Sequence, residues 1–198
     1  MIKKLEQGPL PTNTYIIINE NNNSIVIDPT GNIDNILRVL KDSNVLAILL
    51  THGHWDHIQQ VDKLKEMYKC PIFIHKDDHD LAKSNNTLER FGFESIVRSD
   101  VIYYDNNTLE FDGMKFDIYH TPGHTIGSII IRYENNLFTG DTIFKESIGR
   151  IDFEESDQKA MYESLKYIKT FDPIYDIYPG HGDNSTLEYE FKFNPYLR

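Results

Sequence analysis

Three histidines and one aspartate occur within six consecutive residues, directly after an apolar run. The run is Val45–Leu50, and the residues that follow it read Thr-His-Gly-His-Trp-Asp-His. A continuous apolar run of this length is typical of a strand covered on both faces. In a turning segment His52 and His54 point the same way, whereas Asp56 and His57 bend back from the next turn. Imidazole and carboxylate suit zinc, iron and similar ions, so the segment predicts metal binding.

Three further segments each place one possible ligand in a glycine-flanked loop after a predicted strand. They contain His124 in Thr-Pro-Gly-His-Thr, Asp141 in Thr-Gly-Asp-Thr, and His181 in Pro-Gly-His-Gly. Open α/β sheets gather their ligands at the carboxyl ends of strands, and glycine allows tight turns and close approach there. Five of the eight histidines lie in these loops and the first segment. This convergence favours a metal site over a surface cluster of histidines.

Strand and helix patterns alternate along the chain. Predicted strands lie at Tyr15–Ile18, Ser24–Asp28, Val45–Leu50, Pro71–His75, Ile102–Tyr104, Thr108–Phe111, Lys115–Tyr119, Ser128–Tyr133, Leu137–Phe138 and Ile174–Tyr178. Predicted helices lie at Ile33–Lys41, Val61–Tyr68, His79–Lys83, after the N-cap Asp157, and at Thr186–Phe193, with a surface loop up to Ser99. Apolar strands separated by amphipathic helices indicate an α/β fold of sheets covered by helices. No linker-like stretch divides the chain, so we expect a single domain over residues 1–198.

Composition limits the partners of the chain. Its 20 basic and 31 acidic residues give a formal net charge of −11, and no basic run carries interleaved aromatics, which argues against nucleic acid. Cys70 is the only cysteine, so no intrachain disulfide forms, in keeping with a reducing compartment. The first residues contain no apolar signal-peptide core, and the apolar runs are too short to span a bilayer. We therefore expect a cytoplasmic protein that binds neither nucleic acid nor a membrane.

The motif His-x-His-x-Asp-His, followed by single His, Asp and His loops, resembles the metallo-β-lactamase superfamily. The resemblance runs from about Asn13–Tyr15 to the C-terminus. Thr121–Ser128 and Gly140–Phe144 look like the glyoxalase II (hydroxyacylglutathione hydrolase) branch, and Pro179–Gly182 with Asn194–Leu197 looks like its shorter bacterial members. The resemblance implies a four-layer αββα sandwich with the metal site at one edge of the paired sheets.

The resemblance also implies a ligand set. Carried over by position, the first ion is bound by His52, His54 and His124, the second by Asp56, His57 and His181, and Asp141 bridges both. The implied cofactors are two divalent ions per chain, zinc, with iron or manganese as alternatives. Asp28 matches a position that supports the ligand loop, with turn formation as the alternative role.

The implied reaction is hydrolysis of a thioester, from an S-2-hydroxyacylglutathione to a 2-hydroxy acid and glutathione, by attack of a hydroxide that bridges the metals. Asp56 is the candidate catalytic residue that orients this nucleophile. Lys145 and Arg150 fall in the stretch that contacts glutathione, although Arg150 also suits an ordinary surface ion pair. The β-lactam-degrading branch usually has cysteine where this chain has Asp141, which argues against antibiotic hydrolysis.

Two departures from the family pattern bear on the substrate. Gln59 and Gln60 replace a pair of glycines common after the first motif, and Ile151-Asp152-Phe153 lacks an aromatic that the longer enzymes use nearby. Two alternatives stay open: a mononuclear iron persulfide dioxygenase on the same fold, and a non-catalytic binding module that retains the fold. The true substrate, the metal and the oligomeric state stay open as well.

Overall fold

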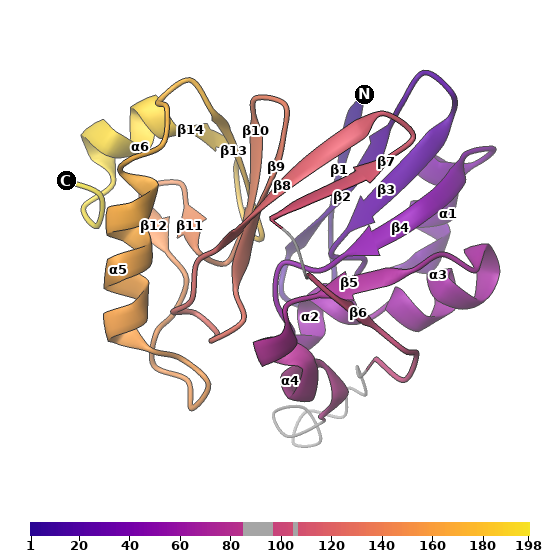
Figure 1. The fold of residues 1–198 in the computed structure, drawn as a ribbon, viewed down its shortest axis with the longest axis horizontal. Helices are drawn as coiled ribbons and strands as arrows, with labels where there is room; N and C mark the ends of the chain where they lie inside the picture. The colour runs from indigo at the N-terminus through magenta and orange to yellow at the C-terminus, as the bar shows by residue number, and fades with distance from the viewer. Residues whose placement is uncertain (85–96, 105–106) are drawn as a thin grey trace. The chain divides into compact units, whose positions relative to one another are not determined.

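The computed structural model describes residues 1–84, 97–104 and 107–198 (Figure 1). Contacts between Cα atoms divide the chain into two compact units, Met1–Tyr104 and Asp105–Arg198, called here the N-terminal and the C-terminal unit. Each is described by itself. That the two units form one domain over residues 1–198 stays a prediction.

The N-terminal unit contains one six-stranded sheet. In sheet order its strands are β1 (Ile2–Gln7), β2 (Thr12–Ile18), β3 (Asn23–Ile27), β4 (Asn44–Leu49), β5 (Ile72–Ile74) and β6 (Ile102–Tyr103). The first three strands are antiparallel, and β3 to β6 are parallel. The crossovers carry α1 (Ile33–Leu40), α2 (Trp55–Ile58), α3 (Val61–Tyr68), the 3-10 turn η1 (Lys76–Asp78) and α4 (His79–Lys83).

The parallel part of this sheet brings distant loops to one edge. Because β3, β4 and β5 run in the same direction, the residues that follow them leave the sheet on the same side. Asp28 follows β3, the histidine-rich segment follows β4, and η1 follows β5. Helix α1 buries Ile36 and Leu40 in the apolar cluster that also contains Ile48 of β4. This packing fixes the sheet from which the loops project.

The C-terminal unit contains a second six-stranded sheet. In sheet order its strands are β14 (Ser185–Thr186), β13 (Asp176–Pro179), β10 (Asn136–Gly140), β9 (Ile129–Tyr133), β8 (Met114–His120) and β7 (Thr108–Phe111). A separate hairpin is formed by β11 (Ile143–Phe144) and β12 (Ser147–Ile148). Helices α5 (Gln158–Ile168) and α6 (Leu187–Phe193) complete the unit. β8 and β10 are both antiparallel to β9, and β10 is parallel to β13, so β8, β10 and β13 share one direction.

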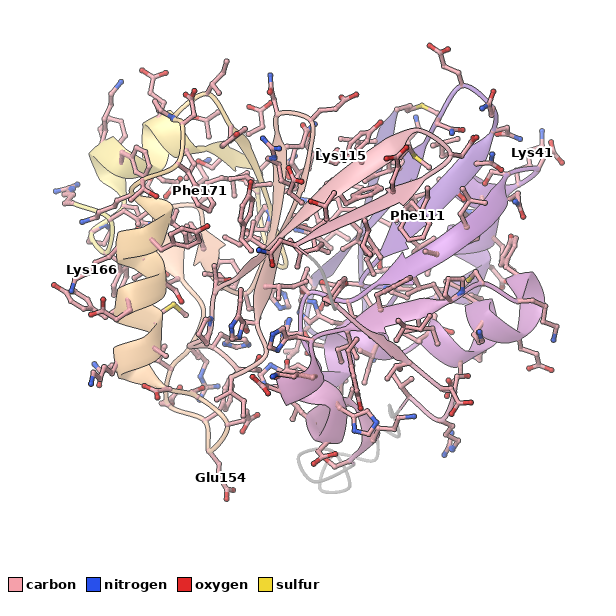
Figure 2. The ribbon with its side chains drawn as sticks, in the orientation of Figure 1. Lys41, Phe111, Lys115, Glu154, Lys166 and Phe171 are labelled. Atoms are coloured by element: carbon pink, nitrogen blue, oxygen red, sulfur yellow. The ribbon has the colours of Figure 1, made fainter. Side chains whose placement is uncertain are left out.

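Helix α5 is amphipathic, and its apolar face forms part of the core of this unit. The N-cap Asp157 accepts the amide of Ala160 at 2.9 Å, which satisfies one of the free N–H groups of the first turn. Met161 and Leu165 are buried in the cluster that includes strand residues of β9, β10 and β13. Burying side chains of this size contributes about 1.5–3 kcal/mol each. Lys166 lies on the opposite face and extends outward (Figure 2).

The sequence patterns predict most of these elements. The predicted helices at residues 33–41, 61–68 and 79–83 are confirmed, whereas the surface loop expected after them lies largely outside the described residues. The patterns missed β1, whose lysine-rich sequence is typical of an edge strand, and also β11, β12 and β14, which are only two residues long. In the described parts of the chain no helix is long and apolar enough to cross a membrane. The cytoplasmic location stays a prediction.

An ion pair joins two neighbouring strands of the C-terminal unit. Asp117 of β8 is the register partner of Arg132 of β9, and the two side chains are hydrogen-bonded. Thr108 donates its hydroxyl to Asp117 at 3.0 Å, and Arg132 donates to the Tyr175 hydroxyl at 2.9 Å. Burial raises the pKa of Asp117, but the hydrogen bonds from Arg132 and Thr108 outweigh burial, so the pKa is lowered overall.

Replacing Asp117 with asparagine is expected to lower the free energy of unfolding at pH 7 by about 1 kcal/mol. A carboxyl whose pKa is lowered by folding stabilises the protein above its unfolded-state pKa, and this stabilisation is lost as pH falls through the folded-state pKa. The difference between variant and wild type should therefore shrink below about pH 4 in urea titrations. Glu110→Gln, an exposed change on the adjacent strand, is the control. A difference that is constant with pH would contradict the assignment.

Candidate metal centre

The N-terminal unit brings together four of the predicted ligands. His52 and His54 lie in the loop after β4, and Asp56 and His57 lie on the short helix α2. The ring centroid of His52 lies 4.8 Å from that of His54 and 4.2 Å from that of His57. His52, Asp56 and His57 are buried, at 1%, 6% and 0% exposure. Three imidazoles and a carboxylate thus gather at one place, and most of them are buried.

Asp28 orients this group from behind. Its carboxylate accepts the amide of Thr51 at 2.8 Å and the Thr51 hydroxyl at 2.6 Å. The second of its oxygens also lies 2.9 Å from Nδ1 of His57. Because a carboxylate is an acceptor, Nδ1 of His57 carries the proton and Nε2 keeps its lone pair for a metal. One ligand atom each of Asp28, His52 and His57 lies within 4.8 Å of the others.

The same carboxylate also sets the tautomer of His52. The Thr51 hydroxyl has one proton, which it donates to Asp28, and it lies 3.1 Å from Nδ1 of His52. It therefore accepts a hydrogen bond from Nδ1, which leaves Nε2 of His52 as a second candidate ligand nitrogen. Asp28 has a left-handed φ of 50° and is 2% exposed, a conformation that surrounding structure must stabilise.

Two buried polar side chains that the sequence analysis did not single out hold the ligand loop. Asp78, fully buried in η1, accepts the amide of Gly53 at 2.7 Å. A side chain at Gly53 would have its Cβ 2.9 Å from the Asp78 carbonyl oxygen, so only glycine fits. The Thr12 hydroxyl lies 3.0 Å from Oδ2 of Asp56. Neither residue lies in a recognisable motif, and only the fold brings them to the loop.

The two glutamines that depart from the family pattern bind the segment after Asp28. Oε1 of Gln59 accepts the Thr30 hydroxyl and the amide of Gly31, both at 2.8 Å. Nε2 of Gln60 donates to the Gly31 carbonyl at 2.5 Å. Their amides thereby fix the chain that continues from Asp28.

Tyr104 forms a hydrogen bond with the residue that follows β4. Burial raises its pKa well above the usual value for tyrosine, and the nearby charge of Asp28 raises it further. The phenol therefore stays protonated and donates to the carbonyl of Leu50 at 3.2 Å. This bond holds the residue directly before the ligand segment.

The C-terminal unit brings together the other three predicted ligands. His124, Asp141 and His181 follow β8, β10 and β13, whose carboxyl ends share one edge of the sheet. Oδ2 of Asp141 lies 3.4 Å from Nε2 of His124 and 3.4 Å from Nε2 of His181. These distances exceed ordinary hydrogen bonds. An oxygen that faces two imidazole nitrogens in this way fits a carboxylate shared between two ions.

His124 is held in a defined tautomer by the loop after β12. Its Nδ1 donates to the carbonyl of Arg150 at 2.8 Å, which leaves Nε2 toward Asp141. The Ser156 hydroxyl donates to the His124 carbonyl at 2.7 Å. A Cβ on Gly149 would lie 1.8 Å from the carbonyl oxygen of Asp141, so this position accepts only glycine. The sequence did not predict a special role for Gly149, because glycine is required there only by the close approach of the Asp141 carbonyl.

Lys145 and Arg150, the predicted substrate contacts, both have acidic partners in this unit. Arg150 forms two hydrogen bonds of 2.9 Å with Asp152, which raise the pKa of Arg150, and its guanidinium lies 4.3 Å from the Phe153 ring centroid. Lys145 Nζ lies 3.6 Å from Oδ2 of Asp183. Their contact with substrate stays a prediction.

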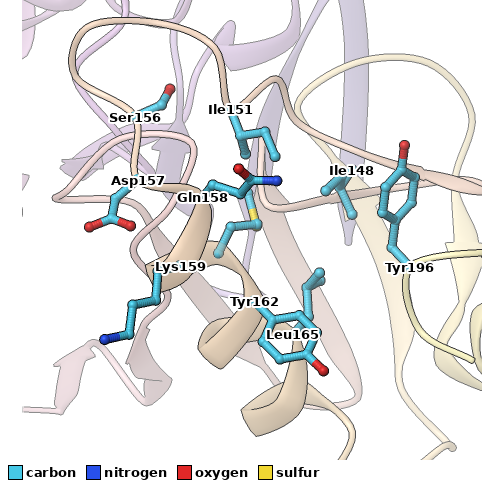
Figure 3. Close-up of a pocket in the computed structure, with 10 residues that line it drawn as sticks. Ile148, Ile151, Ser156, Asp157, Gln158, Lys159, Tyr162, Leu165 and Tyr196 are labelled. Carbon is cyan, nitrogen blue, oxygen red and sulfur yellow. The ribbon is translucent and has the colours of Figure 1, made fainter.

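A cavity of about 670 Å³ lies beside the first turns of α5 (Figure 3). It is lined by Ile148, Ile151, Ser156, Asp157, Gln158, Lys159, Met161, Tyr162, Leu165 and Tyr196. Its volume is typical of small-molecule pockets. Met161 also touches Gly123, where a Cβ would lie 2.4 Å away, so the cavity and the His124 loop share a wall.

The two ligand groups match a known family. The sequence profile of the metallo-beta-lactamase superfamily matches residues 7–181, which include all seven predicted ligands. The chain belongs to the metallo-beta-lactamase superfamily. Its expected α/β class and fold are thereby confirmed, and the family consists mostly of metal-dependent hydrolases.

Similar proteins of this superfamily carry different names. The chain is 33% identical to the hydroxyacylglutathione hydrolase GloC of Haemophilus influenzae, over 93% of this chain and 92% of that protein. Its sequence is 30% identical to that of the BLEG-1 B3 metallo-beta-lactamase. The crystal structure of that protein matches the fold with a TM-score of 0.92 over 100% of this chain and 99% of the other. The chain is also 30% identical to TTHA1623, solved in a di-iron-bound form, with a TM-score of 0.87 over 98% and 100%.

Asp28→Asn is expected to weaken zinc binding about 10- to 100-fold. The amide of asparagine would donate to Nδ1 of His57, which moves the histidine proton to Nε2 and removes that nitrogen as a ligand. Zinc affinity is measured by competition with a chromophoric chelator. Asp34→Asn, an exposed change in the first turn of α1, serves as the control and should bind zinc like the wild type. Equal affinity of the Asp28 and Asp34 variants would show that Asp28 does not orient His57.

Gly149→Ala should destabilise the protein by about 1–3 kcal/mol, because the new methyl group overlaps the Asp141 carbonyl. The displacement of Asp141 should lower zinc affinity at the same time. Gly113→Ala is the matched control, since its Cβ meets nothing within 4 Å and only its φ of 78° costs about 1 kcal/mol. Thermal unfolding and metal titration test both variants. If Gly149→Ala kept wild-type zinc affinity, the contact would not matter for the site.

Proposed function

We propose that the chain is a metal-dependent hydrolase of thioesters that binds two divalent ions. In this proposal His52, His54 and His124 would hold the first ion, Asp56, His57 and His181 would hold the second, and Asp141 would be shared between them. The observation that carries the proposal is the position of Asp141, whose Oδ2 lies 3.4 Å from Nε2 of both His124 and His181. Membership of the superfamily supports the joint use of the two ligand groups.

The side chains fit two divalent ions by the chemistry of their donors. His52, His57 and His124 each have Nδ1 bonded to an oxygen, so each offers Nε2. Imidazole and carboxylate donors accept zinc, iron and manganese alike, and we propose zinc with iron or manganese as the alternatives. Bound divalent ions lower the pKa of water toward neutrality and polarise a carbonyl oxygen.

The residues of this chain supply orientation in the proposed reaction. Asp28 keeps His57 and, through Thr51, His52 in the ligand tautomer. Asp56, whose Oδ2 lies 3.0 Å from the Thr12 hydroxyl, is held where we propose that it orients the attacking water. A thiolate leaves without a proton, so a thioester needs no dedicated general acid.

The proposed substrate class is a small thioester. The 33% identity to the hydroxyacylglutathione hydrolase GloC over nearly all of both chains supports it. Hydrolysis of an S-2-hydroxyacylglutathione is the specific reaction we propose, with Lys145 and Arg150 as contacts to its anionic part. On the basis of the sequence, we also propose that the protein is cytoplasmic and that it does not bind nucleic acid.

Hydrolysis of β-lactams is the second candidate. The observation that favours it is the 30% identity to the BLEG-1 B3 metallo-beta-lactamase over the full chain, with a TM-score of 0.92. Thioesters and β-lactams both present a carbonyl to the same kind of site. The aspartate at position 141 favours the thioester, in keeping with the glyoxalase II-like motifs.

The test combines elemental analysis of the purified protein with hydrolysis of S-D-lactoylglutathione and of a chromogenic cephalosporin. We expect about two metal ions per chain, rapid cleavage of the thioester and slow cleavage of the cephalosporin. His54→Ala and Asp141→Ala should each lose metal and reduce the rate at least 100-fold. His79→Ala, a change at a histidine outside the ligand set, is the control and should keep both.

Other outcomes would redirect the assignment. One iron per chain, oxygen uptake with glutathione persulfide and no thioester cleavage would establish the dioxygenase instead. Faster cleavage of the cephalosporin than of the thioester would establish the β-lactamase. Full metal content and full rate in His54→Ala or Asp141→Ala would show that the ligand set is wrong.

A further inference from the structure

Two fully buried polar side chains at the C-terminal end of the chain are not used by the proposed reaction. Glu190 lies on α6 and Asn194 directly follows it, and both are 0% exposed. A carboxylate and an amide in such a position cost free energy unless they are hydrogen-bonded. Their partners therefore indicate what the two residues do.

Both side chains bind the turn between β11 and β12. Oε2 of Glu190 accepts the amide of Glu146 at 2.8 Å and Nδ2 of Asn194 at 2.9 Å. Nδ2 of Asn194 also lies 2.9 Å from the carbonyl oxygen of Ser147 and 3.3 Å from that of Phe144. Two backbone groups of the turn, the Glu146 amide and the Ser147 carbonyl, are thus bonded to two buried side chains, and the Phe144 carbonyl lies at the longer distance.

This turn needs support, because one of its residues is strained. Glu146 has a left-handed φ of 58°, a region that residues other than glycine enter only at a cost in free energy. The bond from its amide to Glu190 offsets that cost. Ser185 of β14 donates its hydroxyl to Oε1 of Glu190, so the carboxylate is fixed on both of its oxygens. The carboxylate therefore holds the turn in one geometry.

The other side of the turn faces a proposed metal ligand. The ring of Phe144 meets the ring of His181 edge-on, with 5.9 Å between the centroids and an interplanar angle of 86°. Lys145 reaches Asp183, two residues after His181, with Nζ 3.6 Å from Oδ2. The Lys145 side chain is 45% exposed and its ion pair is open to solvent, so the pair is weak and exchangeable.

We propose that Glu190 and Asn194 are positioning residues that hold the Phe144–Ser147 turn so that Lys145 binds a carboxylate in the thiol part of the substrate. The inference rests on the proposed function and adds to it the two residues that place Lys145 for an anionic leaving thiol. Lys145 exchanges Asp183 for the substrate carboxylate. The backbone before His181 also has a bond outside the turn, since the amide of Gly180 donates to the carbonyl of Gly140 at 2.8 Å.

The kinetic test compares two substrates with the same acyl group. S-lactoylglutathione carries carboxylates in its thiol part, whereas S-lactoyl-N-acetylcysteamine is neutral. Glu190→Leu should raise KM for the first about tenfold and leave KM for the second and both kcat values within twofold. Lys145→Gln should have the same effect, and the double variant should show no further rise, because both changes remove one interaction. An additive rise, or equal losses on both substrates, would overturn the proposal.

A measurement without turnover tests the turn itself. Hydrogen exchange of the peptide that contains the Glu146 amide should accelerate in Glu190→Leu. Glu190→Gln keeps an oxygen for the two donors and should restore both the slow exchange and the low KM. Glu188→Gln, an exposed change on the same helix, is the matched control. Metal content should stay within twofold in all of these variants, and unchanged exchange in Glu190→Leu would overturn the proposal.

Two further variants and ligands keep the outcomes separate. If Glu190→Leu does not fold, Ser185→Ala, which removes one bond to Glu190, should raise KM for S-lactoylglutathione two- to threefold, and a wild-type KM would overturn the proposal. If the wild type cleaves neither thioester, the proposed function fails. Binding of S-methylglutathione then tests the inference separately. The inference requires that Lys145→Gln and Ser185→Ala both bind S-methylglutathione with a larger Kd than the wild type does.

Discussion

The site depends on one buried carboxylate, that of Asp28. It accepts the amide and hydroxyl of Thr51 and faces Nδ1 of His57, and through the Thr51 hydroxyl it also sets the tautomer of His52. A metal ligand is useful only when its free nitrogen points at the ion, and the hydrogen bond on the other ring nitrogen decides this. The surrounding bonds from Gln59 and Gln60 to the segment after Asp28 keep that carboxylate in place.

In both units, strands that run in the same direction bring candidate ligands to one edge of the sheet. In the N-terminal unit, parallel strands β3, β4 and β5 end at one edge, and in the C-terminal unit β8, β10 and β13 do so. Residues far apart in sequence therefore leave each sheet close together. Glycines at 53 and 149 are required there because backbone atoms of Asp78 and Asp141 occupy the space of a side chain. Helices α1 and α5 bury their apolar faces in the same clusters as residues of the sheet strands.

We propose a role for the C-terminal segment beyond covering the core. Glu190 and Asn194 bind the backbone of the turn that carries Lys145, and the opposite side of that turn packs against His181. Metal ions polarise different carbonyl compounds alike, so we propose that this turn contributes to substrate preference. The names of similar proteins, a hydroxyacylglutathione hydrolase and a B3 metallo-beta-lactamase, illustrate this range.

The sequence by itself determined the family, the α/β class and the candidate ligands. Spaced histidines and aspartates after apolar runs are local patterns, and local patterns can be found without a structure. The roles of Thr12, Asp78, Gly149 and Glu190 were decided only by tertiary structure. Each acts through a contact with a residue at least 8 positions away, and no spacing in the sequence indicates such a contact. Short strands such as β11 and β12 were missed for the same reason, since pairing and packing, not their two-residue sequences, hold them.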